Sequence, residues 1–296
     1  MYAARLRTPQ KLQFLTQILQ WCEEEENEAL SHGLQPTMML MHAAIGGHLA
    51  YTLVCDFMRK KGHLDWVPSI GNFAVLLSCA ARGGDIIVLN MVAGGLKTET
   101  FPDGSSEGPW YAVEDQCQEH SERLAQVIGV CARRGTAVSL FLSAIRSGSA
   151  EMIKIVVMGI NTHIAGAKER WEALCGVEGN PLTAAASVSV PVFQEALKAL
   201  KDTVNHSEGG EALKDNLRML LLPVENETPL YSAISSESPE LFDEVLRSVR
   251  DYMRDIEATE LTSAEMFRQV SEGVQAPDES EGSKWISAMM LPRVLQ

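Results

Sequence analysis

Two thiols and an imidazole lie near one another in the middle of the sequence. Cys117 and His120 are three residues apart, and Cys131 lies further along the chain. Thiolate and imidazole groups at such spacings are ligands of structural zinc. A closed zinc site needs a second pair of ligands, and the sequence offers no second paired motif. We therefore interpret these residues as part of an ordinary helix with a buried cysteine, and we expect no metal.

Two glycine-rich segments have a composition that suits a phosphate-binding loop. They read Gly46-Gly47-His48 and Arg82-Gly83-Gly84-Asp85. Each lies between two apolar patterns of helical spacing, where a glycine gives the connecting turn an easy positive φ. We interpret both segments as turns between helices, and we interpret His48 as structural.

The sequence gives no convincing catalytic motif. It has no Gly-x-x-x-x-Gly-Lys loop and no His-Glu-x-x-His pair. The spacing Gly-x-Ser-x-Gly occurs at Gly104 to Gly108, but this segment is rich in Gly, Ser, Thr and Asp and is predicted to be a loop, not the strand-to-helix turn of a nucleophile elbow. We therefore predict a protein that is not an enzyme and that needs no cofactor. An enzyme with a divergent helical fold is the weaker alternative.

The clearest structural pattern is a pair of helices between Asn226 and Leu246. Thr228-Pro229-Leu230 opens the first helix, with the proline where a missing N–H is tolerated. Ala233 follows on the same face, and a polar break precedes Pro239. The apolar residues after Pro239 recur at three and four positions, which predicts a second and longer helix.

Related patterns occur elsewhere in the chain, each beginning at a large apolar anchor residue. The anchors are separated by 37, 33, 31, 41 and 48 residues, which favours a common period with insertions. These anchors are Leu40, Leu77, Trp110, Phe141, Leu182 and Leu230. We expect the fourth unit to end at 159–161, and the second helix of the first unit to be one turn long.

Together these units resemble ankyrin repeats. The family pattern runs Thr-Pro-Leu-His, a pair of alanines, Gly-His and paired aliphatic residues. Matching elements are Thr228-Pro229-Leu230, Ala43-Ala44, Gly47-His48 and Val88-Leu89. The resemblance implies an all-α solenoid of stacked helix-turn-helix repeats with capping helices.

The resemblance also implies a domain organisation and a role. Residues 1–33 would form an N-terminal capping helix that starts at Pro9, and residues 34–253 would form about six irregular repeats. Residues 254–296 would form a C-terminal cap and an acidic tail, with a linker near 273–283. The expected function is a protein–protein interaction scaffold or a subunit of a larger assembly.

In ankyrin-like proteins the inter-repeat loops and first helices bind the partner. Exposed aromatic residues and flanking charges are typical anchors of such surfaces. The resemblance therefore implies a partner-binding set of Asp65, Trp66, Phe101, Asp103, Trp110, Tyr111 and Tyr231.

The charge of the chain is strongly uneven. The net charge is −14, and residues 202–284 hold 19 acidic and 7 basic residues, a net charge of −12. This acidity argues against a general nucleic-acid binder, because phosphate contacts need a basic surface. We predict a partner protein with a basic patch that meets Glu240, Asp243 and Glu244 in the C-terminal third. The alternative is that the acidic residues only keep the array soluble.

A pentatricopeptide-like RNA-binding array is the alternative of a different class. It rests on the basic segment 58–62, and on Pro68 and Gly84 with Phe73 between them, which look like that family. The acidity of the chain and the unit at 228–246 favour the ankyrin-like interpretation.

The compartment is predicted from the cysteines and from the absence of long apolar segments. No apolar run approaches the ~20 residues of a membrane span. The cysteines are scattered through apolar helical patterns, which predicts buried thiols in a reducing compartment such as the cytoplasm. They are Cys22, Cys55, Cys79, Cys117, Cys131 and Cys175. The basic and acid-free first 22 residues leave a mitochondrial targeting segment as the alternative.

Overall fold

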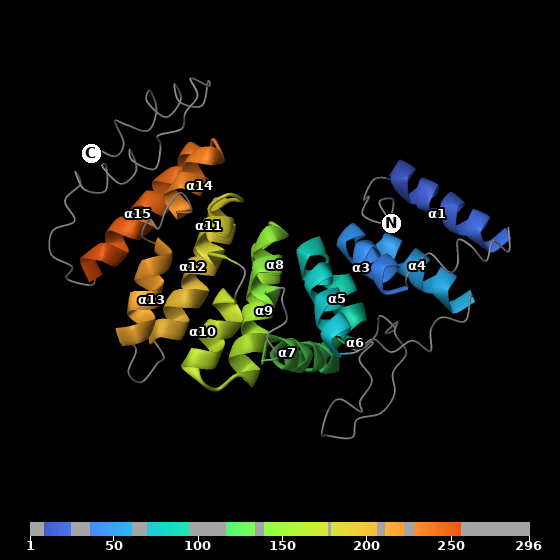
Figure 1. Cartoon of the computed structure of the whole chain (residues 1–296), viewed down its shortest axis with the longest axis horizontal. Coiled ribbons are helices and arrows are strands. Elements are labelled where there is room, and N and C mark those ends of the chain that lie inside the picture. Colours follow the sequence, from blue (N-terminus) through green and yellow to red (C-terminus); the bar gives the residue numbers. More distant parts are fainter. Residues whose placement is uncertain are drawn as a thin grey trace. The chain divides into compact units, whose positions relative to one another are not determined.

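The computed structural model describes residues 9–24, 36–60, 70–94, 117–133, 139–176, 179–205, 211–221 and 228–255. These residues form fourteen helices and no strand (Figure 1), which confirms the predicted all-α class. The chain divides into two compact units. Unit 1 comprises Met1–Ala165 and Glu172–Glu178, and unit 2 comprises Gly166–Trp171 and Gly179–Gln296.

Five helical hairpins account for most of the described residues, and they coincide with five of the six predicted repeats. In unit 1 they are α3 (Pro36–Gly46) with α4 (His48–Lys60), α5 (Ile70–Gly83) with α6 (Ile86–Gly94), and α8 (Leu140–Arg146) with α9 (Ala150–His163). In unit 2 they are α11 (Pro181–Ala185) with α12 (Val190–Asn205), and α14 (Pro229–Ser235) with α15 (Pro239–Asp255).

The remaining repeat is described only in part. Its anchor Trp110 lies outside the described residues. The apolar pattern from Leu124 to Val130, which predicts a helix in this unit, lies within α7 (Cys117–Arg133). The N-terminal helix is confirmed as α1 (Pro9–Glu24), which packs on α4. The predicted C-terminal cap, linker and tail also lie outside the described residues.

The first helices of three hairpins begin in the same way. Ser139, Asn180 and Thr228 are their N-caps, and each side-chain oxygen accepts a backbone N–H from the first turn at 2.9–3.3 Å. These bonds satisfy N–H groups that have no partner inside a helix. The predicted anchors follow two residues after each cap, and all are buried: Phe141, Leu182 and Leu230.

Alanines after each anchor allow neighbouring hairpins to approach closely. These alanines are almost wholly inaccessible in every hairpin: Ala43, Ala44, Ala80, Ala81, Ala144, Ala185, Ala186 and Ala233. In unit 1, α3 packs on α5 and α5 packs on α8. In unit 2, α11 packs on α14 and α12 packs on α15. Successive hairpins of each unit are therefore in contact through their first helices.

Four of the five turns between the paired helices contain a residue with a positive φ. Gly47, Gly84 and Gly148 have φ values of 93°, 70° and 77° in the three turns of unit 1. Glu237 takes the same place between α14 and α15 with a φ of 56°. The predicted role of the two glycine-rich segments as turns is confirmed.

One carboxylate joins two of these turns. Asp85 precedes α6, and its Oδ1 accepts the N–H groups of Ile87 and Val88 at 3.1 and 3.4 Å. The neighbouring helix α4 follows Gly47, which has no side chain to act as a cap. Asp85 Oδ2 fills this role because it accepts the backbone N–H of His48 at 2.8 Å.

Two details of the predicted repeats are wrong. Helix α4 has 13 residues rather than one turn, because Tyr51, Val54 and Met58 continue its buried face. Helix α9 runs past the predicted end of its unit to His163. Gly159 lies inside this helix because it packs against α7, and a Cβ added there would lie 2.7 Å from Ile128 Cγ2.

Two further helices were not predicted. Helix α13 (Glu211–Leu221) packs on α11 and α12, and the Asn180 side-chain amide donates to the Leu220 carbonyl at 2.6 Å. Helix α10 (Ala167–Cys175) has residues in both units. None of the described helices is long and apolar enough to cross a membrane.

Candidate protein-binding surfaces

Only part of the predicted partner-binding set can be placed. Six members lie outside the described residues: Asp65, Trp66, Phe101, Asp103, Trp110 and Tyr111. The other four all belong to the hairpin of α14 and α15 in unit 2: Tyr231, Glu240, Asp243 and Glu244. The structure therefore brings together four of the ten residues.

Tyr231 lies in the first turn of α14, where the Thr228 hydroxyl accepts its backbone N–H at 3.0 Å. The residue is 36% exposed, and Ser235 one turn later is also exposed. The equivalent positions are occupied by Thr183 on the neighbouring α11 and by Ser187 in the turn that follows α11. We call these four residues the unit 2 face. It is uncharged and combines one aromatic ring with three Ser or Thr hydroxyl groups, of which that of Ser187 donates to the Ala184 carbonyl at 2.7 Å.

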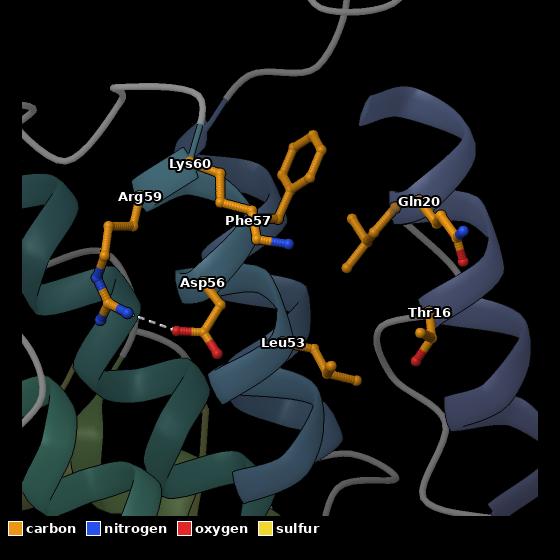
Figure 2. A pocket seen from close by; sticks show the side chains of 8 residues that line it. Thr16, Gln20, Leu53, Asp56, Phe57, Arg59 and Lys60 are labelled. Atoms are coloured by element: carbon orange, nitrogen blue, oxygen red, sulfur yellow. Dashed lines mark hydrogen bonds and ion pairs between the residues drawn. The ribbon is translucent and has the colours of Figure 1, made fainter. Parts of the chain in front are cut away.

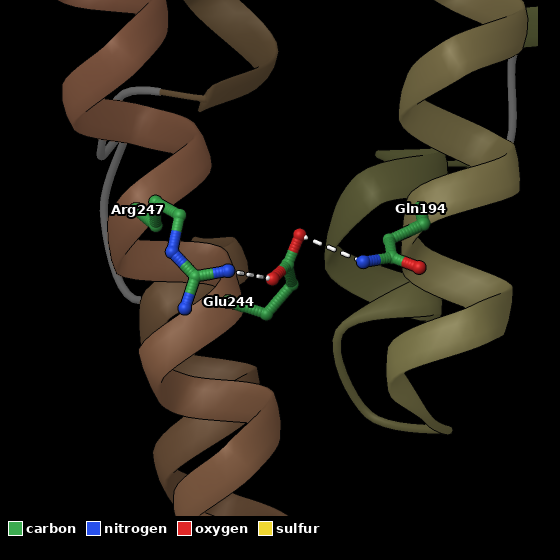
Figure 3. Close-up of polar contacts among 3 residues, drawn as sticks. All are labelled: Gln194, Glu244 and Arg247. Carbon is green, nitrogen blue, oxygen red and sulfur yellow. Dashed lines mark hydrogen bonds and ion pairs between the residues drawn. The ribbon is translucent and has the colours of Figure 1, made fainter.

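Glu244 is occupied by contacts within unit 2 (Figure 3). Its carboxylate accepts from the Arg247 guanidinium at 2.6 Å and from the Gln194 amide at 3.0 Å. Only 14% of the Glu244 side chain is exposed. Because Gln194 belongs to α12, Glu244 links the two hairpins of unit 2 and is poorly placed to meet a partner.

Glu240 is the predicted acid that is most open to solvent. It lies in the first turn of α15, where the positive end of the helix dipole stabilises a carboxylate. The Ser238 hydroxyl lies 3.3 Å from its Oε2, and the residue is exposed. Asp243 is half-buried. The spacing of Glu244 and Arg247 was visible in the sequence, but the contact with distant Gln194 was not.

One further position recurs near the end of the first helix in every hairpin, and it was not identified from the sequence. It comes two residues after the first buried alanine that follows the anchor of each hairpin. Arg82, Arg146, Ser187 and Ser235 occupy it and are exposed, whereas Ile45 is half-buried there. Alignment of the repeats on their alanines could have revealed this position.

Helices α1 and α4 enclose a groove of about 620 Å³ in unit 1 (Figure 2). Leu19 and Phe57 contribute apolar groups that are largely buried, and Thr16 and Lys60 contribute polar ones. Asp56 and Arg59 are already paired with each other at 2.7 Å. The volume falls within the range of small-molecule sites, but these side chains do not form a nucleophile-and-base pair.

The described thiols are not in disulfides. Cys55 and Cys131 are buried, and Cys79 and Cys175 are half-buried. Burial raises the pKa of Cys55 and of Cys175 to about 12, so both are protonated near neutral pH. Among the residues that the structure describes, no group of three or more His, Cys, Asp or Glu side chains could hold a metal ion.

Comparisons of the chain with protein families, with curated proteins and with solved structures find no match. The ankyrin-like and pentatricopeptide-like resemblances therefore depend on the residues of this chain alone.

Proposed function

We propose that the chain is a non-enzymatic protein-binding scaffold or a subunit of a larger assembly, built as an ankyrin-like solenoid. The observation that carries this proposal is the common register of the five hairpins. In each hairpin a buried anchor, a buried alanine and a turn follow in the same order, and within each unit neighbouring first helices are in contact.

The common register brings equivalent surface side chains of neighbouring hairpins next to one another. One hairpin cannot bury its apolar side alone, so hairpins stack and share a core. Within one unit, the side chains that point away from the core at equivalent positions then form a strip. Stacked repeats present extended surfaces of this kind, which repeat proteins use to bind other proteins.

The proposed partner has a basic patch on its surface that binds the acidic C-terminal third of the chain. In unit 2 the exposed Glu240 is a better contact than Glu244, which holds α15 to α12. Tyr231 on the unit 2 face is the proposed aromatic anchor. The buried, protonated thiols suit a reducing compartment, and we propose the cytoplasm.

Photo-crosslinking of the full chain tests this proposal in the cells that produce it. A photoreactive residue replaces Tyr231 on the unit 2 face, and the control replaces Met219 on α13, which is 61% exposed. We expect one defined protein to be captured from position 231 and not from position 219. Capture of RNA, or the same products from both positions, would contradict the proposal.

The charge of the captured partner's surface is tested separately. Glu240→Lys should lower the rate of association with the purified partner. The difference in rate between this variant and the parent chain should decrease at high salt. Glu172→Lys is the matched control, because Glu172 is also exposed but lies outside the acidic third. Equal rates for the two variants would exclude a basic docking patch on α15.

A further inference from the structure

Three residues form a row across the first helices of unit 1. They are Ile45 on α3, Arg82 on α5 and Arg146 on α8, at the equivalent position of each hairpin. A Cβ added at Gly83, next to Arg82, would lie 3.3 Å from Ile45 Cα. A Cβ added at Gly84 would lie 3.3 Å from the Cβ of Ser147, which follows Arg146. The backbones that carry the three side chains are therefore in direct contact.

This row places two exposed guanidinium groups on adjacent helices. Neither Arg82 nor Arg146 makes an ion pair with any residue in the described ranges. Each lies in the last turn of its helix, where the negative end of the helix dipole favours a cation. That position does not require a cation, however, because unit 2 has Ser187 and Ser235 there.

Two acidic groups lie in the neighbouring turns, and both are at helix beginnings. The oxygens of Asp85 accept three backbone N–H groups. Glu151 is exposed in the first turn of α9, where the positive end of that helix attracts it. Neither pairs with the arginines in the described part of the chain, so both arginines remain suited to an anion from outside.

An apolar area adjoins the arginines on α3. Met38 is 38% exposed, and Met41 and Ile45 are half-buried one and two turns along the same helix. Methionine and arginine are enriched in protein interfaces, and methionine adapts its shape to different partners. We call Met38, Met41, Ile45, Arg82 and Arg146 the unit 1 face.

We propose that the unit 1 face binds an acidic amphipathic segment of a partner protein. The planar guanidinium groups are suited to carboxylates, and the side chains of α3 receive the apolar residues of the segment. A protein fits better than a nucleic acid, because the chain carries a net charge of −14 and none of the five residues has an aromatic ring for base stacking. This inference deepens the proposed function, on which it rests, by naming a second surface and the chemistry of its ligand.

The test uses the full chain and a labelled 16-residue helical peptide, with leucines on one side and glutamates on the other. Binding is followed by fluorescence anisotropy at low and high salt. We expect the glutamate peptide to bind, and we expect the same peptide with glutamine in place of glutamate to bind at least tenfold more weakly. This comparison leaves the protein unchanged, so it does not depend on the folding of any variant.

The binding surface is located with serine substitutions, because unit 2 already carries serine at this position. The double variant Arg82→Ser with Arg146→Ser should bind the glutamate peptide about tenfold or more weakly than the parent chain does. The control, Lys168→Ser with Lys198→Ser, removes two exposed positive charges from unit 2 and should leave the affinity unchanged. Melting curves establish that both double variants are folded.

Several results would overturn the inference. They are the absence of peptide binding, equal binding of the glutamine peptide, equal effects of the two double variants, or arginine-dependent binding of a 16-nucleotide single-stranded RNA instead of the peptide. The crosslinking experiment reports on the unit 2 face and the peptide experiment reports on the unit 1 face. Failure of this inference is therefore distinguishable from failure of the proposed function.

Discussion

At the scale of single residues, Asp85 serves two helices at once. It caps α6, which follows it, and it also accepts the first N–H of α4 in the neighbouring hairpin. The sequence reveals only the first of these roles, because an aspartate just before an apolar helical pattern predicts an N-cap. The second role requires that two turns lie side by side, and the absence of a side chain on Gly47 gives the only indication of it.

Removal of the Asp85 carboxylate should therefore cost more than removal of an ordinary cap. Asp85→Ala should lower the free energy of unfolding by about 2 kcal/mol, because two caps worth about 1 kcal/mol each are lost. The free energy of unfolding of Asp85→Asn should lie between those of the parent and of the alanine variant, because an amide keeps one acceptor oxygen.

Urea unfolding measures these differences, and Ser149→Ala is the matched control. Ser149 caps only α9, through the N–H of Met152 at 3.2 Å. If Asp85→Ala and Ser149→Ala destabilise the chain equally, the bond to His48 contributes nothing.

The buried thiols lead to a prediction about pH. Desolvation by burial raises the pKa of Cys55 and of Cys175 from 9.0 to about 12. At pH 8 the thiolate fraction is then roughly a thousandfold smaller than for an ordinary thiol. Iodoacetamide should leave both residues unmodified in the folded chain at pH 8 and should modify them readily in urea, as read by mass spectrometry.

The same shifts set the direction of a change in stability. Unfolded thiols lose their protons near pH 9, whereas the folded ones keep them up to about pH 12. The stability that these groups contribute is therefore complete below pH 9 and declines between pH 9 and pH 12. Rapid labelling of either thiol in the folded chain at pH 8 would contradict this account.

At the scale of helices, the contact of α7 with α9 departs most from the predicted repeat pattern. Gly129 on α7 and Gly159 on α9 allow the two helices to approach closely, and His163 and Ile128 occupy the space that a side chain would need. Helix α7 also packs on α6, so it lies between the second helices of two hairpins. In the sequence Gly159 resembles the end of a helix, because glycine is common there.

Gly159→Ala should destabilise the chain, although the same change usually stabilises a helix interior by about 1 kcal/mol. The added Cβ would lie 2.7 Å from Ile128 Cγ2 and 3.2 Å from the Ala125 carbonyl oxygen. Overpacking of this kind typically costs about 1–3 kcal/mol, which exceeds the gain in helix propensity. Thermal unfolding should therefore show a lower melting temperature.

A double-mutant cycle with Ile128→Ala assigns this cost to the α7–α9 contact. Ile128→Ala removes the Cγ2 atom, so Gly159→Ala should cost less in that background than in the parent chain. A higher melting temperature for Gly159→Ala alone would show that helix propensity outweighs the contact.

At the scale of the whole molecule, patterns within a hairpin were predictable and contacts between hairpins were not. The anchors Leu77 and Leu230 and the turn at Gly84 follow from local periodicity and from the conformational freedom of glycine. Helix α13 could also have been predicted, because Leu213, Leu217 and Leu221 recur every four residues; all three are buried. The row of Ile45, Arg82 and Arg146 depends on which helices are neighbours, and no local pattern specifies that.

The division into two units predicts that a core defect remains local. Leu230→Ala removes a buried anchor of α14 in unit 2, which should cost roughly 2–5 kcal/mol. In a repeat array each hairpin contacts only its neighbours, so this loss should loosen nearby helices first. Hydrogen exchange followed by mass spectrometry should show faster exchange in α11, α12, α14 and α15, and unchanged exchange in α3, α4, α5 and α6.

Leu77→Ala is the matched control for this experiment, because Leu77 is the buried anchor of α5 in unit 1. It should produce the opposite pattern, with faster exchange in α3, α5, α6 and α8 and unchanged exchange in α14 and α15. The reason is again that each anchor shares its core only with adjacent hairpins. If both variants accelerate exchange evenly throughout the chain, the two units unfold as one cooperative body and core defects do not remain local.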